Sequence, residues 1–230
     1  MAAYIHTIGT LESSSSPISP AWPSHQSGDI AFLIVENSGA TLIDLTVPAG
    51  FVQMPDSPTP SGGSRQTRQS VYWCRATTGS MSAPTIADSG NHQGAYIVVV
   101  RGAIETGNPY DVTSASFETT AGTSHTFTTV TTTVDDCLIL LSITRENDSA
   151  TAEYSAFTNA NLTGLAEYFD LGHTVGKGGG FGLGSGVMAT AGATGTSTVT
   201  SVNTVENTVM TIAVLPGTTV SNTTNFFLFF

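Results

Sequence analysis

The sequence contains few charged residues, and the positively charged ones are the scarcest. Only 10% of the 230 residues are charged, and 6 Lys and Arg stand against 17 Asp and Glu, so the net charge is −11. A groove that neutralises several phosphates needs more cations than this, and we therefore expect no nucleic-acid partner. Because the chain itself is negatively charged, we also expect no binding to an anionic lipid surface. Acidity instead favours solubility and mutual repulsion of free subunits.

Long hydrophobic runs are missing as well. Residues Met1 to Tyr4 do not form a basic segment that leads into an apolar one. No stretch approaches the roughly 18 apolar residues that a membrane span needs. We therefore expect a protein that is made and kept in a cytoplasm, with no membrane partner.

Cysteines and metal-binding patterns are also scarce. Cys74 and Cys137 each lie inside an apolar strand pattern, which favours buried thiols over a disulfide. Neither has a histidine or cysteine partner at the spacing of a zinc site. The histidines fall in predicted loops or on polar strand faces, without an H-x-H or H-E-x-x-H pattern: they are His6, His25, His92, His125 and His173. We predict no cofactor and no metal, with one alternative left open, a calcium ion held by Asp135, Asp136 and Asp148.

No catalytic motif is present. The glycine-rich segment Gly176–Gly186 lacks a Ser or Thr after Lys177 and has no G-x-G-x-x-G register, so we expect a loop between strands. No G-x-S-x-G elbow singles out a nucleophilic serine. Paired carboxylates for glycoside hydrolysis could come from four residues, but their spacing in sequence does not give their separation in space: Glu105, Glu118, Glu146 and Glu153. We predict no catalytic residues and no enzymatic activity.

What the sequence does contain is a strand-like pattern that occurs twice. The first copy runs through Gly28-Asp29, Ile30 to Val35, Tyr72 to Gly79 and Tyr96 to Val100. The second runs through Asp135-Asp136, Cys137 to Ile143, Gly186 to Gly192 and Met210 to Val214. With abundant Thr, Ser and Gly, this predicts an all-β fold, a jelly-roll-like β-sandwich built from two similar halves at about 28–103 and 135–216. The aspartates before the core strands are expected to cap turns.

Several weaker segments fill in the rest. Thr41–Val47 and Thr126–Val134 alternate as strands do, and Ala83–Ala87 predicts a shorter one. Leu162–Leu171 is treated as strand plus loop, and Pro55–Gly63 as an exposed loop. The domain therefore spans 28–217, between an N-terminal arm and a C-terminal tail.

The arm and the tail are the expected partner contacts. Residues 1–27 predict a short strand, Tyr4 to Ile8, and an irregular proline- and serine-rich arm that carries Trp22. Residues 218–230 are a polar spacer followed by five large apolar residues: Phe226, Phe227, Leu228, Phe229 and Phe230. Each would forfeit roughly 1.5 to 3 kcal/mol if it stayed in water, so something should cover them. The sequence leaves open a neighbouring subunit, a groove of the same domain or local packing.

The order of turns and strands resembles a known group of proteins. The matching segments are Gly28-Asp29 before an apolar strand, Pro48-Ala49-Gly50-Phe51, Tyr72 to Gly79, Val99 to Ala103, Pro109-Tyr110-Asp111 and Asp135 to Leu138. Over roughly residues 28 to 215 the chain resembles β-sandwich virion proteins of tailed bacteriophages, which occur as capsid decoration (cement) proteins or as modules of tail appendages. The terminal phenylalanine run is not part of that pattern.

The resemblance implies a structural virion protein, expected on the outer capsid at the joints between capsomers. Its partners would be the major capsid protein or other virion proteins, and it would form homo-oligomers and locate to the virion after assembly in the host cytoplasm. An alternative is a tail-fibre or receptor-binding module that recognises host glycans through the loops near Pro55–Gly63 and Gly176–Gly186. A third is a secreted polysaccharide-binding or hydrolytic sandwich, which would need a signal peptide.

Overall fold

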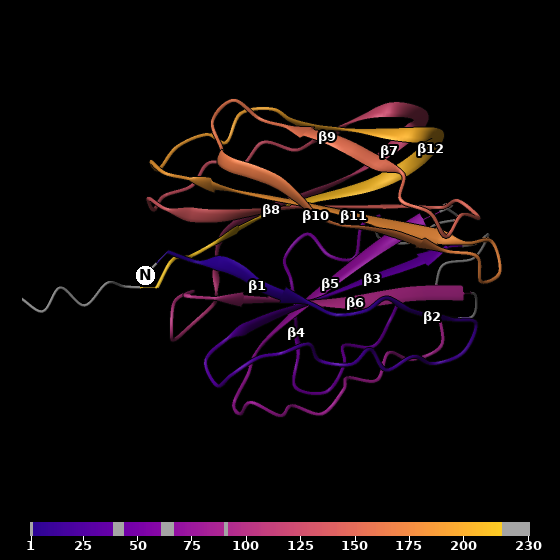
Figure 1. Cartoon of the computed structure of the whole chain (residues 1–230), viewed down its shortest axis with the longest axis horizontal. Coiled ribbons are helices and arrows are strands. Elements are labelled where there is room, and N and C mark those ends of the chain that lie inside the picture. Colours follow the sequence, from indigo (N-terminus) through magenta and orange to yellow (C-terminus); the bar gives the residue numbers. More distant parts are fainter. Residues whose placement is uncertain (1, 39–43, 61–66, 90–91, 218–230) are drawn as a thin grey trace, which may run out of the picture.

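The chain folds into two antiparallel six-stranded sheets that pack face to face (Figure 1). The computed structural model describes residues 2–38, 44–60, 67–89 and 92–217. The first sheet has the order β1 (Tyr4–Ile8), β6 (His92–Arg101), β3 (Ile30–Ser38), β5 (Thr67–Arg75) and β4 (Val52–Gln53), and β2 (Glu12–Ser14) also pairs with β6. Among the described residues, no helix is long and apolar enough to cross a membrane.

The second sheet repeats the plan of the first. Its order is β10 (Thr163–His173), β11 (Gly179–Met188), β8 (Cys137–Arg145), β12 (Ser197–Val214) and β7 (Tyr110–Phe127), and β9 (Tyr154–Thr158) also pairs with β12. In each half the first core strand, β3 or β8, becomes the centre and the next two core strands flank it. The predicted all-β sandwich of two similar halves is confirmed.

The central strands each begin with a continuous apolar run, Ile30–Val35 in β3 and Cys137–Leu141 in β8, because both faces are covered there. Alternate residues of β3, such as Phe32 and Ile34, pack between the sheets against Leu138 and Leu140 of β8. The intervening residues, such as Leu33, belong to a separate core on the outer face of the first sheet. Loops and part of the N-terminal arm cover that face, with these side chains: Ile18, Trp22, Leu45, Phe51 and Ile86.

A third layer covers the outer face of the second sheet. The long ribbon of β7 and β12 loses its regular register between Thr200 and Asn207, and its far half lies with β9 above β8 and β11 (Figure 1). Side chains of this layer, Phe127, Val199 and Tyr154, pack on the outer residues of β8, including Ile139. The ribbon therefore belongs to two layers, and its bend connects them.

The glycine-rich segment is a strand and not the predicted loop. All but its first three residues lie in β11, between β10 and β8. Gly182 and Gly184 face the third layer: a Cβ at Gly182 would come within 2.6 Å of Tyr154 Cδ2, and one at Gly184 within 2.5 Å of Phe157 Cδ1. Glycine is needed there because the covering aromatic rings lie directly on the strand backbone.

Two other predicted strands are reduced. Only Thr126 and Phe127 of the segment Thr126–Val134 belong to β7. The residues after them bond instead to the loop at 192–194, with Thr132 N–H donating to Gly192 O. Ala83–Ala87 makes only an isolated bridge, from Ile86 to Ile18.

The remaining predictions about local structure fare as follows. In Thr41–Val47, residues 44–47 are not strand and 41–43 lie outside the described residues. The strand expected in Leu162–Leu171 is confirmed as β10, and the strand Tyr4 to Ile8 as β1. Cys74 and Cys137 are free and buried as expected, and burial raises the pKa of each thiol to about 11.

Candidate functional site

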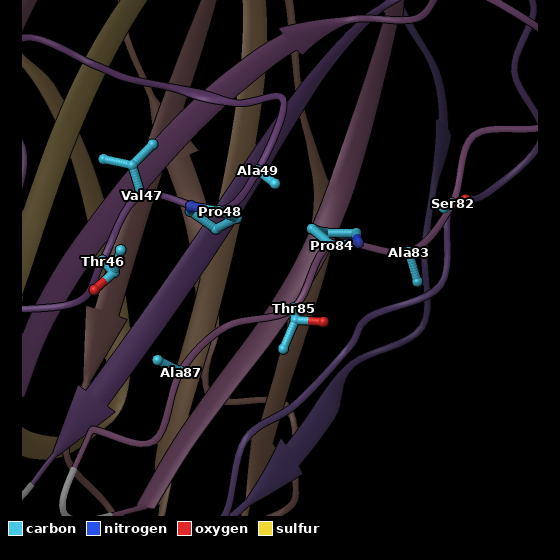
Figure 2. Close-up of a pocket in the computed structure, with 9 residues that line it drawn as sticks. All are labelled: Thr46, Val47, Pro48, Ala49, Ser82, Ala83, Pro84, Thr85 and Ala87. Carbon is cyan, nitrogen blue, oxygen red and sulfur yellow. The ribbon is translucent and has the colours of Figure 1, made fainter.

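The outer side of the first sheet carries a hollow of about 480 Å³. Figure 2 shows its two walls, residues 46–49 on one side and 82–87 on the other. The walls are made by small apolar and hydroxyl side chains: Thr46, Val47, Pro48, Ala49, Ser82, Ala83, Pro84, Thr85 and Ala87. This lining provides no acid, base or nucleophile pair, but it can accept an apolar group.

Trp22 lies beside a neighbouring hollow that it lines with Pro23, His25 and Met81. Its ring is half-buried, with its centroid 4.6 Å from that of His25 and 6.0 Å from that of Phe51. Part of Trp22 is therefore used in the packing of its own domain. Its predicted role in partner binding stays a prediction, and Phe226–Phe230 lie outside the described residues.

A buried polar cluster joins the two sheets at one end of the sandwich. Its centre is Glu36 of β3, whose carboxylate accepts hydrogen bonds from the hydroxyls of Ser38 and Thr67. His173 Nε2 of β10 lies 3.5 Å from Glu36 Oε2. Nearby, Gln69 Nε2 of the first sheet donates to Ser142 Oγ of the second at 2.6 Å. Polar side chains thus replace apolar ones at this end of the interface.

The electrostatics of this cluster follow from its burial. Burial raises the pKa of Glu36, and the contacts with His173, Ser38 and Thr67 only partly oppose this. His92 lies next to it, with its ring centroid 6.2 Å from that of His173, and burial together with His173 lowers the pKa of His92. Its Nδ1 accepts the N–H of Lys177 at 3.2 Å.

Glu36 gives a testable pH dependence. An unfolded glutamate loses its proton near its ordinary pKa of 4.5, whereas folded Glu36 keeps it to higher pH. The folded state therefore binds more protons above pH 4.5, and the free energy of unfolding should fall as pH rises from there. Glu36→Gln should remove this loss, so urea denaturation between about pH 4 and about pH 8 should show a flatter profile than wild type.

The matched control for this experiment is Glu105→Gln, which changes an exposed carboxyl group. It should reproduce the wild-type profile. A Glu36→Gln profile as steep as that of wild type would show that Glu36 is already ionised in the folded protein.

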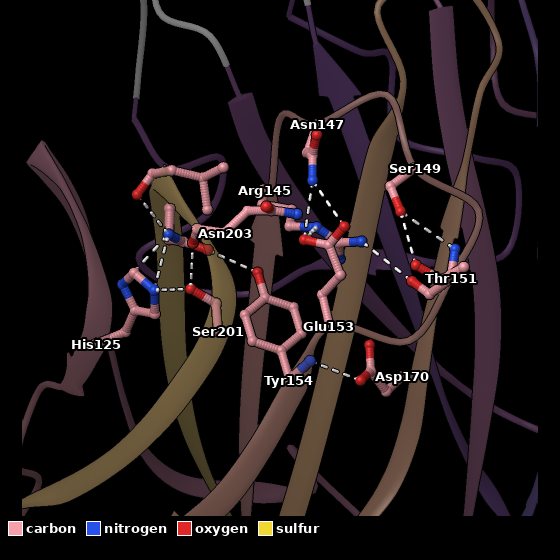
Figure 3. A network of polar contacts seen from close by, with 12 residues as sticks. His125, Arg145, Asn147, Ser149, Thr151, Glu153, Tyr154, Asp170, Ser201 and Asn203 are labelled. Atoms are coloured by element: carbon pink, nitrogen blue, oxygen red, sulfur yellow. Dashed lines mark hydrogen bonds and ion pairs between the residues drawn. The ribbon is translucent and has the colours of Figure 1, made fainter.

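A second polar network lies between the second sheet and the third layer (Figure 3). Arg145 of β8 is fully buried, with its Nε 3.1 Å from Glu153 Oε2, and its guanidinium carbon lies 5.2 Å from the centroid of the Tyr154 ring. Asn147 Nδ2 donates to both Glu153 oxygens at 2.7 and 2.8 Å. Burial alone would raise the pKa of Glu153, but hydrogen bonds, those of Ser149 and Asn147 among them, and the charge of Arg145 outweigh it and lower that pKa.

The same network extends to the bend of the β7–β12 ribbon. Tyr154 O–H donates to Asn207 Oδ1 at 2.6 Å, and Asn207 Nδ2 donates to Val205 O at 3.0 Å. His125 is buried between Glu118, 2.5 Å from its Nδ1, and Ser201, whose hydroxyl is 2.9 Å from its Nε2. These contacts join the two strands of the ribbon to each other and to β9, so they hold the bend in place.

The structure corrects the expected positions of three histidines. His92, His125 and His173 do not lie in loops: they are buried side chains of β6, β7 and β10. Each takes part in one of the two polar clusters, which are formed by residues far apart in the sequence. The histidine positions alone carry no signal of this, because the partners come from other strands.

The aspartates behave partly as predicted. Asp29 accepts the N–H of Gln26 at 2.9 Å, as a turn cap does, and it also accepts two hydrogen bonds from Arg101 at 2.9 and 2.7 Å. Burial would raise the pKa of Asp29, but these bonds outweigh it and lower that pKa. Asp135 accepts the N–H of Ala191.

The alternative of a calcium site gains no support from the geometry. Asp135 and Asp136 precede β8, whereas Asp148 follows it, so the length of the strand separates them. Within residues 2–38, 44–60, 67–89 and 92–217, no group of three or more His, Cys, Asp or Glu side chains is placed to hold a metal ion.

The two polar clusters connect layers of the fold, and their carboxylates contact neighbouring side chains. Their hydrogen bonds and ion pairs hold the layers together. Comparison with protein-family models, with curated proteins and with solved structures finds no match to this chain.

Proposed function

We propose that this protein is a structural component of a tailed-bacteriophage virion, a capsid decoration (cement) protein that binds the outer capsid and stabilises the joints between capsomers. Its partners would be the major capsid protein or other virion proteins, and it would act through buried area and repeated copies, without chemistry. The contacts would come from the arm around Trp22 and from the C-terminal segment Phe226–Phe230.

The observation that carries the proposal is the fold of residues 28–215. The turn-and-strand pattern that resembles phage virion proteins implies a β-sandwich, and these residues fold as one with two similar halves. The positions of the buried charged side chains agree with a mechanical role. Arg145, Glu153 and Glu36 lie between layers, where they connect strands.

Co-sedimentation with purified capsids tests the proposal. The full chain should bind saturably, and a chain that ends at Pro216 should bind at least about tenfold more weakly, which corresponds to about 1.4 kcal/mol. Replacing all five residues of Phe226–Phe230 with serine should have the same effect. The matched control is Val202→Ser, which removes an apolar side chain that is 73% exposed elsewhere on the surface and should leave binding unchanged.

The opposite result would be equally informative. If the full chain does not bind capsids, the decoration role is wrong, and a host-glycan array should then be probed with the same samples. Binding to glycans would favour the tail-fibre or receptor-binding alternative. Of the two loops expected to serve it, Gly176–Gly186 lies mostly in β11, whereas residues 55–60 lie mainly outside the strands.

A further inference from the structure

We propose that the hollow between residues 46–49 and 82–87 is the docking site of the chain's own C-terminal segment, Phe226–Phe230. The inference concerns the free protein and does not depend on a capsid. It rests on the lining of the hollow, on the place where the sandwich ends and on the composition of the remaining chain.

The hollow has the chemistry and the size for aromatic rings. None of the nine residues that line it is charged, and the middle of each wall carries a proline, Pro48 or Pro84 (Figure 2). Val47 is 39% exposed, an apolar side chain without full cover. An apolar cavity of roughly 150 Å³ holds one benzene molecule, so a hollow of about 480 Å³ can accept two phenylalanine rings. Each ring removed from water contributes roughly 1.5 to 3 kcal/mol.

The chain leaves the sandwich within reach of this hollow. Gly217 N–H donates to Gly102 O, directly after β6. Residues 218–230 follow, and an extended chain of that length spans up to about 45 Å. The spacer 218–225 spans up to about 28 Å, and the whole of 218–230 exceeds the roughly 33 Å that the ten residues of β6 cover, so the last phenylalanines can reach along that face of the first sheet.

Because the segment is covalently connected to the sandwich, docking of the molecule's own segment is favoured over docking of the segment of a second copy. A tether of this length holds its end at an effective concentration on the order of 1 mM, well above the concentration of free copies in a dilute solution. Residues 218–230 contain no charged side chain, so the net charge of −11 on the chain does not repel them. Docking would cover part of an apolar run that otherwise promotes aggregation.

Photo-cross-linking of the full chain tests the proposal. We would replace Leu228 with p-benzoylphenylalanine, irradiate a mixture of isotopically light and heavy protein, and map the cross-links by mass spectrometry. The expected products join residue 228 to peptides that contain residues 46–49 or 82–87, within one molecule. Cross-links to another part of the domain, cross-links only between light and heavy molecules, or none at all would each overturn the proposal.

Two valine variants provide the specificity control. Val47→Glu places a carboxylate on the wall of the hollow and should reduce the cross-links to its walls at least about tenfold, because docking would then desolvate a charge. Val202→Glu makes the same change at a side chain that is 73% exposed on β12 and should leave the yield as in the unchanged chain. Equal yields from the two variants would show that the hollow does not hold the segment. Both positions are exposed, so both variants should fold, and circular dichroism checks this.

Discussion

Replacing Gly182 with alanine is expected to destabilise the protein by about 3 kcal/mol, at the upper end of the usual cost of overpacking. The new methyl group would lie 2.6 Å from Tyr154 Cδ2 and 2.8 Å from Ile143 Cγ2. Both side chains are buried, so neither can move away without disturbing the third layer. Urea denaturation followed by circular dichroism measures the loss as a lower midpoint.

Gly122→Ala is the matched control, because Gly122 is also a strand glycine. Its nearest neighbour to an added Cβ is Ser124 O at 3.9 Å, an ordinary contact. Alanine there should leave the free energy of unfolding within about 0.5 kcal/mol of wild type. If Gly182→Ala is tolerated as well as Gly122→Ala, the third layer does not rest on β11 as described.

Removing the guanidinium of Arg145 should have an equally large effect. Arg145→Met leaves the carboxylate of Glu153 buried without its cation, and breaking such a pair from one side costs about 3 to 5 kcal/mol. The same measurement of denaturation applies. The double variant Arg145→Met with Glu153→Gln should recover a large part of the loss, since no uncompensated charge then stays in the interior.

The exposed ion pair between Lys177 and Glu146 provides the contrast. Their charged atoms are 3.8 Å apart and the Lys177 side chain is 56% exposed. Lys177→Met should therefore change stability by less than about 1 kcal/mol. A loss at Arg145 no larger than at Lys177 would mean that the buried pair does not connect β8 to the third layer.

The sequence predicted the core of the fold because each central strand begins with an apolar run that has no polar face. Ile30–Val35 and Cys137–Leu141 are covered on both sides, and continuous apolar runs signal this directly. The same reasoning failed for β11. Glycine is normally a sign of a loop, but here its missing side chain makes room for Tyr154 and Phe157, which are distant in sequence.

Strand alternation also misled at one place. The threonines after Phe127 alternate as a strand would, yet the backbone here bonds to the loop at residues 192–194, and Thr128 and Thr133 reach β7 only through side-chain contacts. Alternation reports only that two faces differ in polarity, and a loop that lies on the surface can have the same pattern.

The polar clusters were the part of the structure that the sequence predicted least well. Glu36, His173 and Arg145 are individually ordinary residues in the sequence, and their importance comes from pairing across sheets and layers. No local pattern marks such partners. The aspartate before β3 was expected to cap a turn and does so, since a cap bonds only to nearby backbone; its second partner, Arg101, comes from another strand.

The two halves of the chain also differ in when they can fold during synthesis. The strands of the first sheet end at Arg101, before any strand of the second sheet begins, so that sheet can form early. In the part of the chain that the structure describes, β7 pairs only with β12, the last strand, so it stays unpaired until nearly all of the second half has been made. An unpaired strand that waits is an aggregation hazard. The threonine and serine side chains of β7 keep it hydrated meanwhile, so its hydroxyl-rich composition protects the nascent chain as well as the finished surface.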